Sequence, residues 1–579
     1  MRAPSARPFW SLKSPGLLNF PKLKLKVPLF VKAARAHLMV CAAALVIAAI
    51  LHLALLFYLI CGGAVYDVAL RVMMAAGMWT RGGRIAEWKR RRHQGMASRR
   101  EIRRLMSPAA MQKKVQLTRP ATNVKRMAPT EVGAHIGKSA GRMTHQKLMG
   151  SWEDFYLVFA GPRMGKTGWF SDVVLNVPGA VVSTSTRADV LAHTIMTRQE
   201  LGGPVYVLNP TNDAGISSTL FWNPVTGCDN PATAIERAGY MMAAAPKDSS
   251  GKDAWWDHQG GEALRLAFHA AALKDRDMMQ VKSWIADLTD PELLDILEHD
   301  PGAAYGWADE LRKMITRADD DAEYMNGVSR AAGTALSWLA DPEMERVACP
   351  LPDEEFNPEQ FILAGGTMYL IGAHRPHSSL TPYFSCLIMD IWNTAKQVAA
   401  ASLGLRLDPP LAMVIDEPAL CFRGPLDQMS AEAGGHGITV VTGVQSPAQL
   451  IQVWGENGGK IIRDNASIKL YFGGMTDAAE LKALSDLCGS VDSWHYVHTP
   501  EGKIKQPTQI PLLSIARLRT LAAGQAVMLH RSGRPVITQV AAVWKRKGYE
   551  PANLADYVWA TDEETEMVSL EKEVSERIG

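Results

Sequence analysis

Cysteine is scarce in this chain, and no two cysteines have the spacing of a metal site. Seven cysteines are scattered through 579 residues. Neither a framework of disulfides nor a zinc site built on paired cysteines is therefore expected. We expect small, buried, apolar thiols in a reducing compartment. The seven are Cys41, Cys61, Cys228, Cys349, Cys386, Cys421 and Cys488.

Acidic residues are almost absent from the N-terminal quarter. Residues 1–147 contain 4 Asp and Glu against 27 Lys and Arg, whereas the rest of the chain contains 55 acidic and 35 basic residues. The formal net charge of +3 conceals this asymmetry. The acidic body excludes a generally basic surface, so any contact of the body with nucleic acid must be local, such as the lining of a channel.

One hydrophobic run is long enough to cross a bilayer. Residues 38–60 are apolar but for one histidine. We expect Gly62-Gly63 to break this run. The poorer stretch 64–79 then either completes a hairpin of two spans or continues as an amphipathic helix. The hairpin is favoured because it leaves both basic flanks inside, and the basic cluster at 89–104 places the body in the cytoplasm in either case.

An apolar strand leads directly into a glycine-rich turn and a helix. Residues 155–160, FYLVFA, have the composition of a buried strand, GPRMGKT follows, and WFSDVVLNV is typical of a helix. Such a turn aims backbone N–H groups at a phosphate, and the helix N-terminus adds its positive dipole end. Lys166 would reach the β- and γ-phosphates, and the Thr167 hydroxyl would hold Mg²⁺. Ala160 stands at the first glycine position of the usual pattern, so Gly161 is expected to supply the turn.

A second motif is acidic and lies far along the chain. Residues 411–415, LAMVI, predict an apolar strand that ends in Asp416-Glu417. At the C-terminal edge of a parallel strand, Asp416 would bind Mg²⁺ through water and Glu417 would act as general base on the attacking water. The next strand ends at Gln445, which would sense the γ-phosphate or orient water. A glutamine bonded only to backbone is the alternative.

Three arginines are candidates to act on a neighbouring subunit's site in a ring assembly. The segment 461–475, IIRDNASIKLYFGGM, predicts another strand with Arg463 just before it, and Arg375 and Arg423 compete with Arg463. A surface salt bridge is the alternative for each.

Short strands alternating with helices predict an α/β fold with a mostly parallel sheet and helices on both faces. Strand signals vanish between residues 232 and 345, which predicts an all-helical insertion. In this insertion Trp255, Trp256 and His258 either stack on bases or, as we favour, belong to the helical core. Residues 524–540 predict a closing hairpin around Ser532-Gly533.

Composition and motifs divide the chain into seven parts. A short helix at 95–107, capped by Ser98, is either a solvated helix beside the membrane or a surface for DNA or lipid head groups. The parts are a basic tail that binds anionic lipid (1–37), one or two transmembrane segments (38–80), a basic juxtamembrane connector (81–150), the first part of a nucleotide-binding domain (151–231), an inserted all-α domain (232–346), the second part of the nucleotide-binding domain (347–548) and an acidic tail (549–579).

The chain resembles the type IV secretion coupling proteins, the TraG/VirD-type conjugative DNA-transfer ATPases, in a form like those of Gram-positive actinobacteria. The resemblance covers residues 38–545 and rests on an ordered set: the membrane anchor, GMASRREIRRLMS, AGPRMGKT, VVSTSTRADVL, the helical insertion, LAMVIDEPA, GHGITVVTGVQSPAQLIQVWG and DNASIKLYFGG. It implies a RecA-like P-loop NTPase fold related to the FtsK/HerA translocases. It also implies a homo-hexameric ring on the cytoplasmic membrane whose helical domain meets a cargo of single-stranded DNA with a relaxase, beside secretion-channel components.

We therefore expect a membrane-anchored ATP hydrolase that drives DNA or a relaxase–DNA complex into a secretion or conjugation channel. Lys166, Glu417 and Gln445 would act in catalysis, and Thr167 and Asp416 would hold Mg²⁺. One alternative is a docking receptor for protein substrates with little ATPase activity, which the acidic body and Ala160 favour. The other is a translocase of double-stranded DNA of the FtsK kind. The predicted ATP contacts are Ala160, Gly161, Pro162, Arg163, Met164, Gly165, Lys166, Thr167 and Gly168.

Overall fold

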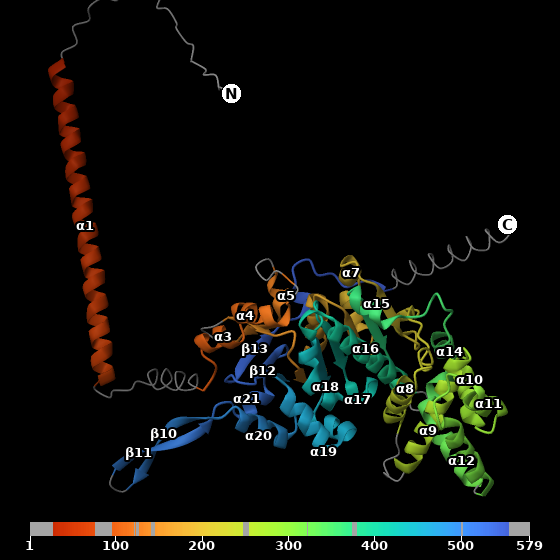
Figure 1. Ribbon diagram of the computed structural model, residues 1–579. Helices are drawn as coiled ribbons and strands as arrows, with labels where there is room; N and C mark the ends of the chain where they lie inside the picture. The colour runs from red at the N-terminus through yellow and green to blue at the C-terminus, as the bar shows by residue number, and fades with distance from the viewer. Residues whose placement is uncertain are drawn as a thin grey trace, which may run out of the picture. The chain divides into compact units, whose positions relative to one another are not determined.

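The structure is a computed structural model, and it describes residues 27–75, 95–120, 122, 127–140, 145–246, 254–320, 322–372, 379–499 and 502–554. The chain divides into two compact units, residues 1–88 and residues 89–579. Figure 1 shows the helices and strands of both.

A single helix, α1 (Val27–Ala75), makes up the described part of the first unit. Its stretch Arg35–Gly63 is long and apolar enough to cross a membrane, and it is the one such helix among the described residues. The predicted break at Gly62-Gly63 is wrong, because the helix runs through both glycines. A glycine costs a helix about 1 kcal/mol relative to alanine but keeps its backbone N–H, so the hydrogen-bonded ladder continues. The favoured hairpin of two spans is wrong for the same reason.

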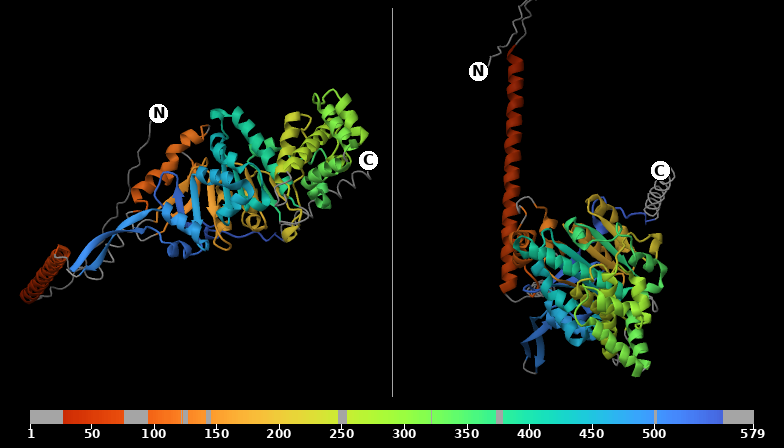
Figure 2. Two further views of the ribbon diagram at one scale, coloured as in Figure 1. Left: turned by 90° about the horizontal axis from the view of Figure 1, so that it is seen from below. Right: turned by 45° about the vertical axis from the view of Figure 1, so that its right-hand side comes forward.

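An eleven-stranded sheet forms the centre of the second unit (Figures 1 and 2). Its order is β2-β1-β13-β12-β9-β3-β8-β7-β4-β6-β5. Neighbours from β9 to β5 pair in parallel, and β2, β1, β13 and β12 form an antiparallel extension beside β9. The predicted α/β fold with a mostly parallel sheet is therefore confirmed. The bounds are β1 Ala134–Ser139, β2 Lys147–Gly150, β3 Tyr156–Phe159, β4 Val181–Ser185, β5 Val205–Leu208, β6 Thr367–Ile371, β7 Leu411–Asp416, β8 Ile438–Val444, β9 Ile468–Phe472, β12 Gln525–His530 and β13 Val536–Val540.

Helices cover both faces of the sheet. On the central strand β3, Tyr156 and Val158 pack into one core and Leu157 and Phe159 into the other, as the two-residue repeat of a strand requires. All four side chains are buried, which explains why the strand is a continuous apolar run. The first core includes α6 (Lys166–Asn176) and α7 (Asp189–Glu200), and the second includes α16 (Thr381–Ala401), α18 (Leu426–Glu432) and α19 (Pro447–Asn465).

The segment predicted as a basic connector, residues 81–150, contains helices and strands from residue 95 onward. It contains α3 (Arg99–Leu105), α4 (Pro108–Thr118), α5 (Pro129–Val132) and the strands β1 and β2. Strand β1 pairs with β13 from the other end of the chain, a partner that local composition does not reveal. The predicted cap is present, because the Ser98 side chain accepts a hydrogen bond from the Glu101 backbone N–H (3.2 Å).

An all-helical insertion lies between β5 and β6, and no strand occurs among its described residues. Trp256 packs against the second core, which also contains Leu157 and Phe159, so the core interpretation is correct for this side chain. Trp255 is 44% exposed, with the Arg317 guanidinium 5.0 Å from its ring, and His258 is exposed. Stacking on bases stays a prediction for these two. The helices are α8 Pro231–Ala244, α9 Ala254–Leu273, α10 Met278–Ala286, α11 Pro291–His299, α12 Trp307–Asp320, α13 Ala322–Ala335, α14 Pro342–Ala348 and α15 Pro358–Leu363.

The C-terminal part of the chain completes the antiparallel extension. The predicted hairpin is confirmed, because β12 and β13 pair on either side of the turn at Ser532-Gly533. Before it stand α20 (Ala478–Leu487), α21 (Ile515–Arg519) and a separate two-stranded ribbon of β10 (Ser490–Thr499) and β11 (Gly502–Pro511), none of which the sequence predicted. The predicted acidic tail lies, beyond residue 554, outside the described residues.

The cysteines mostly follow the prediction of buried thiols. Cys228, Cys386, Cys421 and Cys488 are buried and Cys349 is half-buried. Cys41 and Cys61 are exposed on α1.

Candidate nucleotide-binding site

The glycine-rich turn joins β3 to α6. Ala160 still belongs to the sheet, because its N–H donates to the Val444 carbonyl on β8 (3.1 Å) and its side chain is buried. Alanine therefore fits at this first position of the pattern, and the turn begins at Gly161. Left-handed backbone occurs later, at Arg163 (φ 62°) and Gly165 (φ 101°). The second glycine of the motif is thus the one whose conformation favours glycine.

The first turn of α6 is built to face an anion. Its N-cap is Gly165, and no side chain caps the helix. The backbone N–H groups of Lys166, Thr167 and Gly168 consequently have no acceptor within the helix. Together with the positive end of the helix dipole, such unpaired donors are the feature that favours an anion at a helix N-terminus.

The two distant motifs meet at the C-terminal edge of the parallel strands. Strand β8 lies between β3 and β7, so the end of β7 stands two strands from the glycine-rich turn. Lys166 Nζ lies 2.7 Å from Asp416 Oδ1 and 3.5 Å from Glu417 Oε1. Gln445, just after β8, donates from Nε2 to Glu417 Oε1 (3.2 Å). The structure therefore brings together the lysine, both carboxylates and the glutamine that the sequence singled out.

Glu417 adopts a backbone conformation that glutamate rarely takes. Its φ of 47° and ψ of 58° are left-handed, and Pro418 follows at the start of the short helix α17 (Pro418–Cys421). A residue before proline is ordinarily extended, so this conformation is strained. Two hydrogen bonds hold it, because the Glu417 N–H donates to the Gly443 carbonyl (3.0 Å) and to Asp416 Oδ1 (2.9 Å). In this conformation the Glu417 carboxylate lies beside the Lys166 ammonium and accepts a hydrogen bond from the Gln445 amide.

The carboxyl of Asp416 is buried beside the Lys166 ammonium. Burial raises the pKa of Asp416 to about 6, with Lys166 opposing this shift and the nearby Glu417 carboxylate adding to it. At neutral pH the group is an anion paired with Lys166. Below pH 6 it carries a proton and is a poorer metal ligand.

We expect the affinity for Mg²⁺ to fall as the pH falls through about 6, by about tenfold per pH unit, because the proton and the metal compete for Asp416. The measurement is the Mg²⁺ concentration that half-saturates ATP turnover between pH 5 and pH 8. The affinity of Mg²⁺ for free ATP at each pH must be divided out, because phosphates also titrate near pH 6.

A loss of Mg²⁺ affinity at low pH cannot be explained by unfolding that the titration of Asp416 causes. The pKa of Asp416 in the folded protein lies above the ordinary value of 3.8, so this group stabilises the fold at low pH and loses that contribution as the pH rises through 6. An unchanged half-saturating Mg²⁺ concentration between pH 5 and pH 7 would contradict the assignment of Asp416 as a metal ligand.

Segments that no motif marks close around the glycine-rich turn. The Gly524 N–H donates to the Met164 carbonyl (2.9 Å), and Gly524 has a φ of 76°. A Cβ on Gly168 would stand 2.3 Å from the Trp544 ring, so this glycine permits close packing of the C-terminal segment on α6. The glycine at 524 is the only weak signal in the sequence for this bracing.

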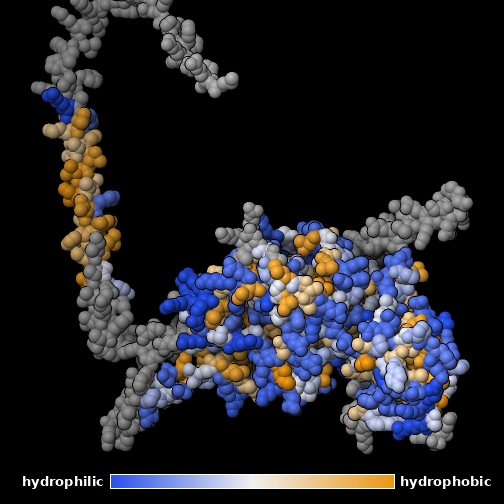
Figure 3. Space-filling model, in the orientation of Figure 1, coloured by the Kyte–Doolittle hydropathy of each residue, from blue (hydrophilic) through white to orange (hydrophobic). Residues whose placement is uncertain are grey.

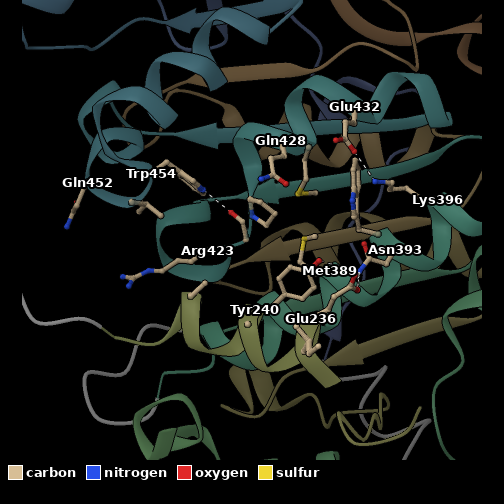
Figure 4. Close-up of a pocket in the computed structure, with 18 residues that line it drawn as sticks. Glu236, Tyr240, Met389, Asn393, Lys396, Arg423, Gln428, Glu432, Gln452 and Trp454 are labelled. Atoms are coloured by element: carbon tan, nitrogen blue, oxygen red, sulfur yellow. Dashed lines mark hydrogen bonds and ion pairs between the residues drawn. The ribbon is translucent and has the colours of Figure 1, made fainter. Parts of the chain in front are cut away.

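The arginine candidates lie apart from the cluster or outside the described residues. Arg375 is among the residues that the structure does not describe. Arg463 is half-buried in the last turn of α19. Arg423 lies at a groove of about 950 Å³ between α8, α16, α18 and α19 (Figure 4). Its Nε is buried and, among the described residues, has no hydrogen-bond partner. A role on a neighbouring subunit stays a prediction for all three.

In Figure 4 the Arg423 side chain extends away from the Lys396–Glu432 ion pair (2.9 Å) at the other side of the groove. The loop that carries Arg423 is fixed, because Trp454 Nε1 donates to the Gly424 carbonyl (2.8 Å). Arg423 thus stands on a rigid support six residues after Glu417.

Comparisons with known proteins agree with this architecture. Residues 410–523 match the family model described as the TraM recognition site of TraD and TraG. No curated protein matches the chain. The bacterial conjugative coupling protein TrwB, truncated at its N-terminus and unbound, is similar with a TM-score of 0.52 at 16% identity, covering 72% of this chain and 90% of that one.

Two further solved structures match with lower TM-scores. TrwB with ADP and Mg²⁺ gives a TM-score of 0.48 at 17% identity, covering 69% of this chain and 87% of that one. VirB4 of Thermoanaerobacter pseudethanolicus gives a TM-score of 0.45 at 13% identity, covering 71% of this chain and 96% of that one. The fold of a conjugative coupling protein and the TraD/TraG match at residues 410–523 together confirm the resemblance of this chain to the type IV coupling proteins.

Proposed function

We propose that the chain is a membrane-anchored ATP hydrolase that drives DNA, or a relaxase bound to DNA, into a type IV secretion channel. One observation carries the proposal: Lys166, Asp416 and Glu417 converge within 3.5 Å at the end of a parallel sheet, beside the uncapped N-terminus of α6. Such an edge is where open α/β sheets bind ligands.

The residues present fit ATP with Mg²⁺. Lys166 and the backbone N–H groups of the first turn of α6 would bind the phosphates, and the Thr167 hydroxyl and the Asp416 carboxylate supply the oxygen ligands that Mg²⁺ prefers. Bound Mg²⁺ would supply positive charge to the phosphate oxygens. Lys166 now pairs with Asp416, and it is free to turn to a phosphate once Asp416 has another cation as partner.

Glu417 is the proposed general base. Its left-handed backbone holds the carboxylate in place, and the Gln445 amide fixes one of its oxygens. The other oxygen is left to accept a proton from water. Gln445 would thereby act on the attacking water through Glu417 and orient it.

The proposal extends to the assembly and its setting. Helix α1 would anchor the chain in the cytoplasmic membrane, with the body in the cytoplasm and, as one span requires, the N-terminal tail on the other side. A homo-hexamer, secretion-channel components and a relaxase are proposed as partners from the resemblance. An acidic body suits DNA held in a central channel rather than on the outer surface.

The alternative of a docking receptor with little ATPase activity is supported by the acidic body alone. The alanine at the first position of the glycine-rich turn no longer favours it, because the Ala160 N–H bonds to the Val444 carbonyl and the turn begins at Gly161.

ATP turnover of the full chain in lipid nanodiscs, with and without DNA, tests the proposal. We expect single-stranded DNA to raise turnover several-fold, with a stimulation that falls steeply as salt rises, because DNA contacts release counterions. The same preparation carrying Lys166→Ala gives the background. Turnover at background level with and without DNA would contradict the motor and favour the docking receptor. Stimulation by double-stranded DNA alone would indicate a translocase of the FtsK kind.

A further inference from the structure

The end of the second unit from which the chain leads to α1 is strongly basic. Residues 95–97 are fixed there, because Gly95 packs against Val491 and Leu512 at the root of the β10–β11 ribbon and the Ala97 N–H donates to the Pro535 carbonyl (3.1 Å). Helix α3 begins directly after this point. Figure 3 shows strongly hydrophilic residues gathered at the end of the unit that holds α3 and α4.

We call this surface the basic face. It consists of Arg100, Arg103 and Arg104 on α3, Lys113 and Lys114 on α4, and Arg531 and Arg534 in the turn between β12 and β13, all of which are exposed. The opposite side of α3 is apolar, because Ile102 and Met106 are buried in the core. The helix therefore lies flat on the body and presents its arginines outward.

A groove of about 640 Å³ lies between α3 and the β12–β13 turn. Its lining includes three guanidinium groups and two hydroxyl groups, from Arg100, Arg104, Arg534, Ser98 and Ser532, together with the carboxylate of Glu101. Glu101 is already engaged, since its Oε1 accepts a hydrogen bond from the Arg534 backbone N–H (2.7 Å). Guanidinium and hydroxyl donors around one groove are the donors that bind a phosphodiester.

We propose that the basic face binds the head groups of anionic phospholipids and holds this end of the body against the membrane. The charge contrast is local, because the chain from residue 148 onward has 55 acidic and 35 basic residues. Basic segments next to a membrane span are attracted to anionic lipid in this way.

Two observations favour lipid over DNA as the partner. Gly95 follows the end of α1 at Ala75 by twenty residues of sequence, so the basic face belongs to the chain next to the candidate membrane span. Leu117 on α4 is 76% exposed three residues beyond Lys114, and an exposed leucine beside lysines suits a membrane interface but not a DNA backbone. The proposal rests on the anchoring part of the proposed function and not on ATP hydrolysis.

Hydrogen exchange of the full chain in nanodiscs tests this inference. In nanodiscs with phosphatidylglycerol, the amides of α3 and α4 are expected to exchange about fivefold more slowly than in phosphatidylcholine alone. Salt at 0.5 M, which shortens the Debye length to about 4 Å, should remove most of the difference. The amides of α12 serve as an internal reference that lipid composition should not change.

The variant Arg100→Gln/Arg103→Gln/Arg104→Gln should lose the difference between the two lipids, and the matched variant Lys313→Gln/Arg330→Gln on the helical insertion should keep it. Both should retain ATP turnover in phosphatidylcholine, which separates this inference from the proposed ATPase. Equal exchange in the two lipids would overturn the proposal. So would slower exchange caused only by added DNA, which would make the basic face a nucleic-acid surface.

Discussion

Replacement of Lys166 by alanine is expected to lower kcat for ATP hydrolysis by about 10²–10³-fold, because one preorganised cation at the transferring phosphate is lost. The structure adds a second effect. Without the ammonium 2.7 Å away, the buried Asp416 carboxyl loses the group that lowers its pKa, so more of it is protonated at neutral pH. Binding of Mg²⁺ and ATP turnover should therefore fall together.

The measurement is steady-state ATP turnover of the full chain with DNA present, combined with a Mg²⁺ titration. Arginine is not expected to rescue the site, because its planar fork does not reproduce the compact ammonium that lies 2.7 Å from Asp416. Lys460→Ala, an exposed lysine on α19, is the matched control and should be as active as the parent. Turnover within threefold of the parent in Lys166→Ala would exclude a phosphate role for this lysine.

The second large effect is expected for Glu417→Gln. The substitution keeps the size of the side chain and the left-handed backbone but removes the base, so kcat should fall by about 10²–10⁴-fold. ATP binding should be retained, because Lys166 and the first turn of α6 are unchanged. The variant should therefore hold ATP without turning it over.

Single-turnover hydrolysis and equilibrium binding of labelled ATP separate these two quantities. Glu432→Gln removes an exposed carboxylate at the groove and serves as the control, with both quantities expected to stay at the parent level. A parent rate of hydrolysis in Glu417→Gln would assign the base to another group. A loss of ATP binding would instead mean that Glu417 organises the pocket.

Several features were accessible from the sequence because they depend on local chemistry. The strand before the glycine-rich turn is a short apolar run, and the acidic pair follows another such run, so their places at strand ends could be predicted. Two features escaped prediction, each for its own reason. Residues 108–150 look like a linker because β1 is completed by β13, roughly four hundred residues later. Gly62-Gly63 was predicted to break the helix because glycine disfavours helices. Glycine keeps its backbone N–H, however, whereas proline lacks this donor and would have interrupted the hydrogen bonding.

The sequence by itself determined which chemical groups this protein has: a glycine-rich turn, two carboxylates, a glutamine and a long apolar run. Each of these is encoded in one short, continuous stretch of chain, where turn conformation and local composition act. The tertiary structure alone decided that Lys166 and Asp416, 250 positions apart, share an ion pair, that Glu417 is held left-handed, and that Trp544 packs on the helix of the glycine-rich turn. These depend on strand order and on the desolvation that comes with packing, and neither is written in any local stretch of chain.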